Sequence, residues 1–185
     1  YASSSSVYGG LSEKKLSENL NINNPIQIYA ATKISNEMIA NAYFQLYKIP
    51  TVGLRFFTVY GPWGRPDMAS FKFIKNIIEN KKIEIYNYGK NCRDFTFIDD
   101  IVKGILTIHK KMISKNIKHE IFNIGNGKSV NILKFIEEFE KQLNVKAKKN
   151  FVSMQKGDMV RTRANINKLY KIFNYKPKTS YQEGI

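Results

Sequence analysis

A tyrosine and a lysine, Tyr29 and Lys33, stand four residues apart in a segment of helical periodicity, and four serines precede them. Residues four apart on a helix project from the same face, so a phenol and an ammonium can share one pocket. A nearby positive charge favours a phenolate and lowers a tyrosine pKa from its ordinary value of about 10. A general base works best when its pKa approaches the working pH. The pattern indicates a proton-transfer site in which a serine hydroxyl holds the substrate oxygen.

The spacing alone also fits a solvated helix surface. The chain holds 11 Tyr and 30 Lys and Arg residues, so pairs four apart arise by chance. The surrounding motifs have to decide between the two interpretations.

The composition fits one packed core. Hydrophobic residues make up 43% of the 185 and aromatic residues 13%, which suits one domain better than two large ones. No apolar run is long enough to span a bilayer, and no charged-then-apolar leader stands at the start. The single cysteine, Cys92, excludes an internal disulfide, and His109 and His119 are too few for a zinc site. We expect a cytoplasmic protein without a metal.

The formal net charge of +15 raises the question of a nucleic-acid partner. The lysines are spread along the chain, and no motif that reads nucleic acid is present. We expect the charge to attract an anionic small molecule such as a sugar nucleotide.

Apolar strands and amphipathic helices alternate along the chain, which predicts an α/β fold. Strands are expected at 1–4, 51–57, 83–86, 94–98, 121–124 and 149–152. Helices are expected at 28–47, 69–79, 99–111, 129–143 and 167–173, with the opening of another at 181–185. Residues 12–24 are expected to form a loop.

Turn and cap residues mark the ends of these elements. Residues 61–66 (GPWGRP) predict a loop at the carboxyl end of the strand at 51–57, where open α/β sheets bind their ligands. Asp99 and Ser129 are predicted to cap the helices that follow them.

Four motifs stand in one order: 2–9 (ASSSSVYG), 29–33 (YAATK), 54–62 (LRFFTVYGP) and 93–100 (RDFTFIDD). With Gly157-Asp158 they resemble the extended short-chain dehydrogenase/reductases, and within them the NAD-dependent nucleotide-sugar epimerases, most closely those acting on UDP-glucuronate. The resemblance covers almost the whole chain. It implies the carboxyl-terminal part of a Rossmann-like parallel sheet plus a smaller α/β substrate-binding region.

The resemblance implies a catalytic triad of Ser4, Tyr29 and Lys33. In that family the serine lies three residues before the valine of the first motif. Tyr29 would take the proton of the sugar 4-hydroxyl while NAD takes the hydride from C4. Lys33 would hold the nicotinamide ribose and keep the phenol acidic. The 4-keto sugar then turns and accepts the hydride on its other face.

Differences within the family favour plain epimerisation. The dehydratases have an Asp-Glu pair after the catalytic threonine, and the UDP-glucuronate decarboxylases have Glu where this chain has Ser6. Thr58 matches the glucuronate epimerases, since galactose epimerases have Asn there. We assign the grip on the sugar carboxylate to Arg65, because a guanidinium makes paired, charge-assisted contacts. Thr58, Ser5 and Ser6 would assist. The alternative is that Arg65 braces its loop through backbone carbonyls.

The resemblance also assigns contacts to the nucleotide. Arg93 would meet the diphosphate and Asp158 a ribose hydroxyl. The full set assigned to the nucleotide is Phe71, Tyr86, Arg93, Gln155 and Asp158. Tyr86 could equally be a core aromatic at a strand edge.

Two phenylalanines are assigned to the cofactor. Phe56 and Phe57 would border the nicotinamide. A buried strand would carry apolar residues at these positions in any case, so their type alone does not establish that role. Gln27 and Ile28 depart from the family, which has Ser or Pro near this position, and this puts one substrate contact in doubt.

The family's glycine-rich dinucleotide fingerprint, G-x-x-G-x-x-G, occurs nowhere in the sequence. We therefore expect the carboxyl-terminal portion of a 4-epimerase that interconverts UDP-glucuronate and UDP-galacturonate, inactive without an amino-terminal half. Residues 1–66 would belong to the NAD-binding fold and 67–185 mainly to the UDP-sugar region. The full-length protein would be a homodimer. The alternatives are another nucleotide-sugar epimerase or dehydratase, or a non-catalytic fragment that binds a nucleotide sugar.

Overall fold

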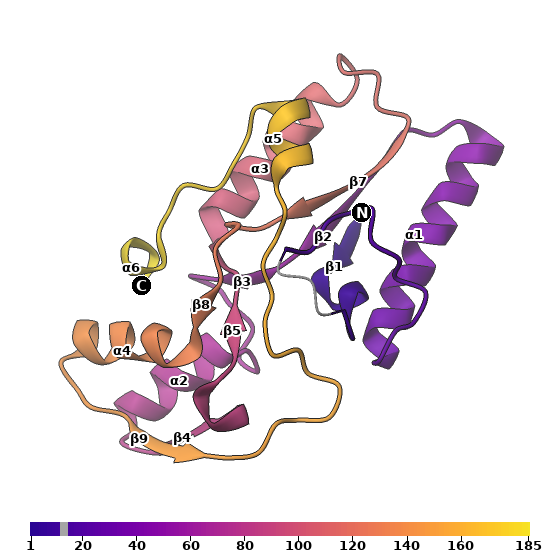
Figure 1. The fold of residues 1–185 in the computed structure, drawn as a ribbon. Coiled ribbons are helices and arrows are strands. Elements are labelled where there is room, and N and C mark those ends of the chain that lie inside the picture. The colour runs from indigo at the N-terminus through magenta and orange to yellow at the C-terminus, as the bar shows by residue number, and fades with distance from the viewer. Residues whose placement is uncertain (12–14) are drawn as a thin grey trace.

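The computed structural model describes residues 1–11 and 15–185 and shows a mixed α/β protein (Figure 1). The strands are β1 (Ala2–Ser4), β2 (Thr51–Phe56), β3 (Thr58–Tyr60), β4 (Lys82–Ile85), β5 (Cys92–Arg93), β6 (Phe95–Phe97), β7 (His119–Ile124), β8 (Val130–Asn131) and β9 (Lys148–Phe151). The α-helices are α1 (Ile28–Tyr47), α2 (Ala69–Ile78), α3 (Ile98–Lys111), α4 (Ile132–Leu143), α5 (Asn167–Phe173) and α6 (Tyr181–Gly184), and 3-10 helices are η1 (Ser5–Tyr8) and η2 (Tyr86–Gly89). The predicted α/β class is confirmed. The expected loop at 12–24 is described only from Lys15 onward, where no helix forms.

Three parallel strands form the central sheet in the order β1-β2-β7. Leu54 lies opposite Ala2 on one side and Phe122 on the other. Helix α1 and the pair α3 and α5 lie on opposite sides of this sheet (Figure 1). The face toward α3 and α5 is apolar, with a core of Val52, Leu54, Ile101, Ile108, Phe122, Ile124, Leu169 and Phe173. The strand at 51–56 is therefore buried on both faces, as its apolar run predicts.

The strand predicted at 51–57 is interrupted at Phe57. Phe57 donates its N–H to the carbonyl of Ile124, and the next residue, Thr58, donates to the carbonyl of Asp94. The chain thereby leaves the central sheet, and β3 pairs with β6 instead of continuing β2. The sequence predicts that the loop at 61–66 follows the strand at 51–57 directly. The short strand β3 lies between them, so that prediction is wrong.

A second group of elements lies below the central sheet in Figure 1, where α2, α4, β4 and β9 come together. Strands β4 and β9 are parallel, and β5 and β8 are antiparallel. The core of this group is aromatic and isoleucine-rich: Tyr60, Phe73, Ile77, Ile83, Ile85, Phe95, Phe135, Ile136 and Phe139. Phe95 and Phe135 stack with ring centroids 3.7 Å apart.

Two predicted helix caps are wrong. Helix α3 has Phe97 at its N-cap, so Asp99 lies in the first turn, where a carboxylate interacts favourably with the helix dipole. Helix α4 is capped by Asn131, whose side chain accepts the N–H of Leu133 at 2.9 Å. Ser129 is not the cap because the short strand β8 delays the start of the helix.

Helix α1 is the longest helix described. It ends at Lys48, which adopts a left-handed conformation (φ 55°) and donates its N–H to the carbonyl of Phe44. Pro50 follows and stops any continuation. Across residues 1–11 and 15–185, no helix combines the length and apolar character needed to cross a membrane.

The buried carboxylate of Asp94 joins the two groups of elements. It accepts backbone N–H donors from Asn126 at 2.8 Å, Gly127 at 2.9 Å and Ala164 at 2.9 Å. Those donors lie in the turn after β7 and in the segment that leads to α5. One side chain thus fixes two chain segments at the carboxyl end of the central sheet.

Stability should depend on the ionisation of Asp94. Burial raises its pKa to about 6 against the opposing effect of the N–H donors, whereas an unfolded aspartate titrates near about 3.9. Between these two pKa values the folded protein binds more protons than the unfolded chain. The contribution of Asp94 to stability therefore grows as the pH falls from 7 to 4 and is lost as the pH rises through 6. Asp94→Asn replaces the titratable carboxyl with an amide. The NH₂ of that amide would face backbone N–H groups that also donate.

We expect the full-length Asp94→Asn variant to unfold at a lower temperature than wild type at pH 7. The difference should widen as the pH falls to 4, because only the wild type gains stability there. Thermal unfolding of both proteins at pH 7, 6, 5 and 4 measures this. If the difference in unfolding temperature narrows toward pH 4, the N–H donors lower the pKa of Asp94 more than burial raises it.

Candidate active site

The three predicted catalytic residues come from two adjacent elements, since Ser4 ends β1 while Tyr29 and Lys33 lie in the first turns of α1. Lys33 Nζ donates to the carbonyl oxygen of Ala2 at 3.1 Å and lies 5.7 Å from the centroid of the Tyr29 ring. The Tyr29 side chain is half exposed. The phenol and the ammonium therefore share one accessible face beside the strand that ends in Ser4.

The serine hydroxyls form a small cluster at the start of η1. Ser4 Oγ accepts the backbone N–H of Ser6 at 3.2 Å and donates to Ser6 Oγ, also at 3.2 Å. Ser5 follows Ser4 as the first residue of η1. The Ser4 side chain is buried and the Ser6 hydroxyl is partly buried, so both are held in place by the turn itself.

A buried ion pair fixes α1 against the sheet. The Arg55 guanidinium on β2 donates from Nε to Glu37 Oε1 at 2.8 Å and from Nη2 to Glu37 Oε2 at 2.7 Å. Arg55 is 3% exposed and Glu37 5% exposed. Desolvation lowers the pKa of Arg55, but the hydrogen bonds and charge interactions with Glu37 and Tyr8 together outweigh it and raise that pKa. The Arg55 guanidinium is therefore charged in the folded protein.

The ion pair is part of a larger buried network. Ser3 Oγ donates to Glu37 Oε1 at 2.6 Å, which ties β1 to α1 next to Ser4. Tyr8 accepts a hydrogen bond from Arg55 Nη1 at 2.8 Å and donates its own to Asn123 Oδ1 on β7, also at 2.8 Å. Burial raises the pKa of Tyr8 to about 12, so the phenol keeps its proton. All three strands and α1 meet in this network.

Sequence reasoning missed Glu37 and Arg55, although two signals were available. Glu37 follows Lys33 by four residues, so it lies on the face of α1 that carries Tyr29 and Lys33. Arg55 interrupts an apolar strand, and a fully buried arginine needs a charged partner.

A cavity of about 630 Å³ lies in the second group of elements, beside β3. It is lined by residues of β3, β4, β5, β6 and α2 and by the chain near residue 155. We call it the Arg93 cavity. Five of the residues assigned from the resemblance line it: Thr58, Tyr86, Arg93, Gln155 and Asp158. Tyr86 donates its hydroxyl hydrogen to Glu84 Oε2 at 2.9 Å and faces the cavity, so it is not a core aromatic.

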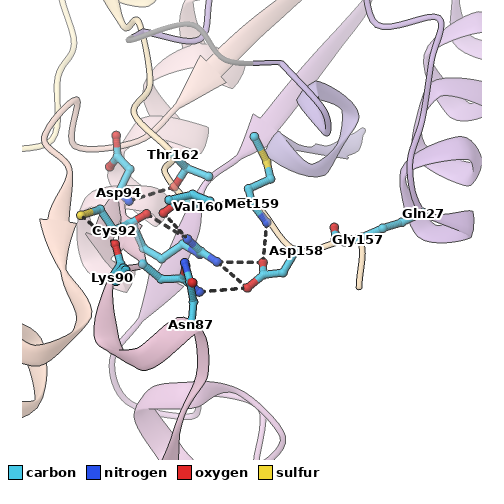
Figure 2. A network of polar contacts seen from close by, with 12 residues as sticks. Gln27, Asn87, Lys90, Cys92, Asp94, Gly157, Asp158, Met159, Val160 and Thr162 are labelled. Carbon is cyan, nitrogen blue, oxygen red and sulfur yellow. Dashed lines mark hydrogen bonds and ion pairs between the residues drawn. The ribbon is translucent and has the colours of Figure 1, made fainter. Parts of the chain in front are cut away.

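Figure 2 shows the polar contacts around Asp158 in the wall of this cavity. Arg93 Nη2 donates to both carboxylate oxygens of Asp158, each at 2.7 Å, and Asn91 Nδ2 donates to Asp158 Oδ2 at 3.2 Å. The two residues assigned to separate parts of the nucleotide thus pair with each other. Gln27, just before α1, donates to the carbonyl of Gly157 and links the catalytic helix to this wall.

Arg65 pairs with a neighbouring carboxylate. Its Nε donates to Asp67 Oδ1 at 3.0 Å, and its Nη2 forms an ion pair with Asp67 Oδ2. The pKa of Arg65 is raised, chiefly by the hydrogen bond with Asp67, and Tyr29 is close enough to add a smaller charge effect. Both side chains are largely exposed. Arg65 therefore binds the Asp67 carboxylate through two guanidinium nitrogens. A sugar carboxylate would require the same paired geometry.

Three assigned phenylalanines lie away from the Arg93 cavity. Phe57 is 4% exposed and packs in a core with Tyr8 and Ala164, so it is enclosed by protein. Phe56 is partly buried against the apolar face of the sheet. Phe71 is 42% exposed on α2, whereas its neighbours Lys72 and Phe73 line the cavity.

Comparisons with known proteins identify the group to which this arrangement belongs. The sequence profile of the NAD dependent epimerase/dehydratase family matches residues 1–125. The chain belongs to this family. The protein MJ1055 of Methanocaldococcus jannaschii is 55% identical over 185 residues, which is 100% of this chain and 56% of that protein. UDP-glucuronate 4-epimerase 4 of Arabidopsis thaliana is 46% identical over 198 residues, covering 100% of this chain and 45% of that enzyme.

Solved structures of the epimerase/dehydratase family share the fold. UDP-glucuronic acid 4-epimerase from Bacillus cereus, in complex with UDP-glucuronic acid and NAD, matches with a TM-score of 0.93 and 39% identity. The match covers 99% of this chain and 57% of that one. The chain spans about half the length of the relatives it matches. Within the described residues, no group of His, Cys, Asp or Glu side chains could hold a metal ion.

The buried ion pair gives the first test of this site. Glu37→Ala leaves the Arg55 charge buried without its partner and should lower the free energy of unfolding by about 3–5 kcal/mol. Urea unfolding of the full-length protein measures the loss. The control is Glu79→Ala, which removes an exposed partner of Lys81 and should change stability little. Equal effects of the two substitutions would contradict the role given to the buried pair.

Proposed function

We propose that this chain is the proton-transferring, nucleotide-sugar-binding part of a 4-epimerase that interconverts UDP-glucuronate and UDP-galacturonate with NAD. The observation that carries the proposal is the geometry of Lys33, whose ammonium lies over the Tyr29 ring and is bonded to the strand that ends in Ser4. Membership of the epimerase/dehydratase family and the similarity to UDP-glucuronate 4-epimerases support it.

The described residues fit one end of an NAD molecule. Tyr29 and Lys33 are accessible beside the carboxyl end of β1, and a lysine ammonium has three donors, of which one bonds to Ala2. Lys33 would hold a ribose hydroxyl with another. The bound cofactor supplies hydride transfer at C4 of the sugar. The rest of its site needs a glycine-rich fingerprint that the printed sequence does not contain, so activity requires an amino-terminal half.

The chain's own residues handle the proton. Tyr29 accepts the proton of the sugar 4-hydroxyl as C4 is oxidised and returns it when the keto group is reduced. Ser4 donates a hydrogen bond to the same sugar oxygen and fixes its position. Ser6 is too weak an acid or base to drive elimination or decarboxylation, which favours epimerisation alone.

The Arg93 cavity suits the UDP part of the substrate. Arg93 would exchange one of its bonds with Asp158 for the diphosphate, and Asp158 would then accept a ribose hydroxyl. Tyr86 and Gln155 line the same cavity. Arg65 would grip the sugar carboxylate in place of Asp67, with Thr58 beside it. Phe71, Phe56 and Phe57 lie near these elements, but none of the three lines the Arg93 cavity.

We also propose that the full-length protein forms a homodimer through α1. Four large apolar side chains, Met38, Ile39, Tyr43 and Leu46, are more than half exposed on this helix. An apolar helix face of this kind is usually covered by a partner.

The proposal is tested by restoring an amino-terminal half. A fusion of this chain to the part of the M. jannaschii relative that it does not cover should interconvert UDP-glucuronate and UDP-galacturonate. Tyr29→Phe should lower kcat by about 10²–10⁴-fold because it removes the general base. Tyr47→Phe, on the same helix and exposed, is the matched control and should leave kcat unchanged. A folded fusion that binds UDP-glucuronate without converting it would favour the non-catalytic alternative.

Arg65 gives a separate test of sugar recognition. Arg65→Ala should weaken binding of UDP-glucuronate by about ten- to a hundredfold and leave UDP-glucose binding almost unchanged. Asp67→Asn should strengthen UDP-glucuronate binding, because it removes the carboxylate that competes for the guanidinium. Calorimetric titration of the fusion with both sugars measures these effects. Equal losses for the two sugars in Arg65→Ala would show that Arg65 does not hold the carboxylate.

A further inference from the structure

A second cavity, of about 870 Å³, lies on the other side of the segment that contains Asp158. We call it the Arg161 cavity. The charged residues that line it within the described part of the chain are mostly basic: Lys128, Arg161 and Arg163 contribute cations, and one carboxylate, Asp158, is already paired with Arg93. The volume is within the range of small-molecule sites, about 300–1,000 Å³. A cavity of this size and charge suits an anionic small molecule.

The basic residues are held in position by the backbone around them. Arg161 pairs with Cys92 through a backbone bridge, so it is fixed beside β5. Arg163 Nε donates to the carbonyl of Gly127 at 2.9 Å, which orients the guanidinium toward the turn after β7. Arg161 and Arg163, two residues apart on one segment, and Lys128, in the chain after β7, line one space. Paired donors of this kind favour phosphate oxygens.

A polar atom in the same lining lacks a partner among the described residues. The Ser129 hydroxyl oxygen is buried and makes no hydrogen bond within that part of the chain. Ser129 lies next to Lys128 in the wall of the Arg161 cavity. A buried hydroxyl without a partner is costly to the folded protein.

The remaining wall is apolar. It consists of Leu11, Ile26, Met159 and Val160, and Ile26 and Val160 are about half exposed. Phosphate alone would leave this surface in water, whereas a nucleoside would cover it. The combined chemistry therefore favours a molecule with a diphosphate group and a ring system.

Asp158 lines both cavities and is held by Arg93 from the other side. Arg93 lines only the Arg93 cavity, whereas Asp158 lines both. An anion in the Arg161 cavity would repel the Asp158 carboxylate and also a second anion in the neighbouring Arg93 cavity. This repulsion couples the two sites negatively and reciprocally.

We propose that the Arg161 cavity is a second binding site for a nucleoside diphosphate, and that its occupancy weakens binding in the Arg93 cavity. The coupling rests on the proposed function of the Arg93 cavity, whereas the second site itself does not. Such a site would make the enzyme sensitive to the level of free nucleotides.

Methyl NMR of the NAD-saturated full-length protein tests the site directly. Titration with ADP should shift the methyl signals of Ile26 and Met159 saturably and leave that of the distant, exposed Ile113 unchanged. Arg161→Gln with Arg163→Gln should weaken this binding by about tenfold or more. Inorganic pyrophosphate should bind more weakly than ADP, because it does not cover the apolar wall.

Matched variants separate local charge from net charge and from folding. Lys110→Gln with Lys115→Gln removes two exposed lysines elsewhere and should leave ADP binding unchanged. Lys128→Gln removes a cation of the cavity without breaking the bond between Arg163 and Gly127, and should also weaken ADP binding. The site is excluded if Ile26 and Met159 do not shift, or if the control weakens ADP binding as much as the arginine variants. Equal affinity for pyrophosphate and ADP would overturn the assignment to a nucleoside.

The coupling has its own measurement. Saturating ADP should raise the Kd for UDP-glucuronate in wild type but not in the double arginine variant. An unchanged Kd in wild type would overturn the coupling. If UDP-glucuronate does not bind at all, the proposed function fails, while the methyl shifts with ADP still decide whether the second site exists.

Discussion

The ion pair between Arg55 and Glu37 holds the structure together at the point where its chemistry lies. An arginine on the central strand and a glutamate on α1 are both almost fully buried and joined by two hydrogen bonds. Isolated buried charges are too costly to persist, so strand and helix must dock in the one arrangement that pairs them. Glu37 lies one turn beyond Lys33, and Ser3, which bonds to Glu37, lies one residue before Ser4. The docking therefore sets the position of all three side chains of the proposed triad at once.

A second constraint places the substrate region against the first. The Asp94 carboxylate holds the turn after β7 and the chain at Ala164, while the next residue back, Arg93, pairs with Asp158. Gln27 reaches from the start of α1 to Gly157. The segment 157–164 thus connects the catalytic helix, the central sheet and the Arg93 cavity. A rigid link of this kind is suited to keep a sugar in register with a base on another element.

The local elements could be predicted from the sequence, whereas the contacts between distant residues could not. Helix α1 follows from the spacing of Ile34, Met38 and Ala42, and β2 from its short, mostly apolar and β-rich run. The break at Phe57 was missed because it depends on a distant residue: Thr58 donates its N–H to the carbonyl of Asp94, which lies 36 residues after Thr58. The bond between Arg93 and Asp158 joins residues 65 apart, and no local pattern encodes it. The motifs located the site, and the partners of its charges came from the fold.

The central claim is that Tyr29, held by this scaffold, takes the proton of the sugar 4-hydroxyl. A crystal structure of the fusion, with UDP-glucuronate and NAD bound, tests it most directly. The sugar 4-oxygen should lie within about 2.6–3.2 Å of the Tyr29 hydroxyl, the distance that proton transfer requires, with the carboxylate on Arg65. A sugar bound with its 4-oxygen facing another side chain would contradict the claim.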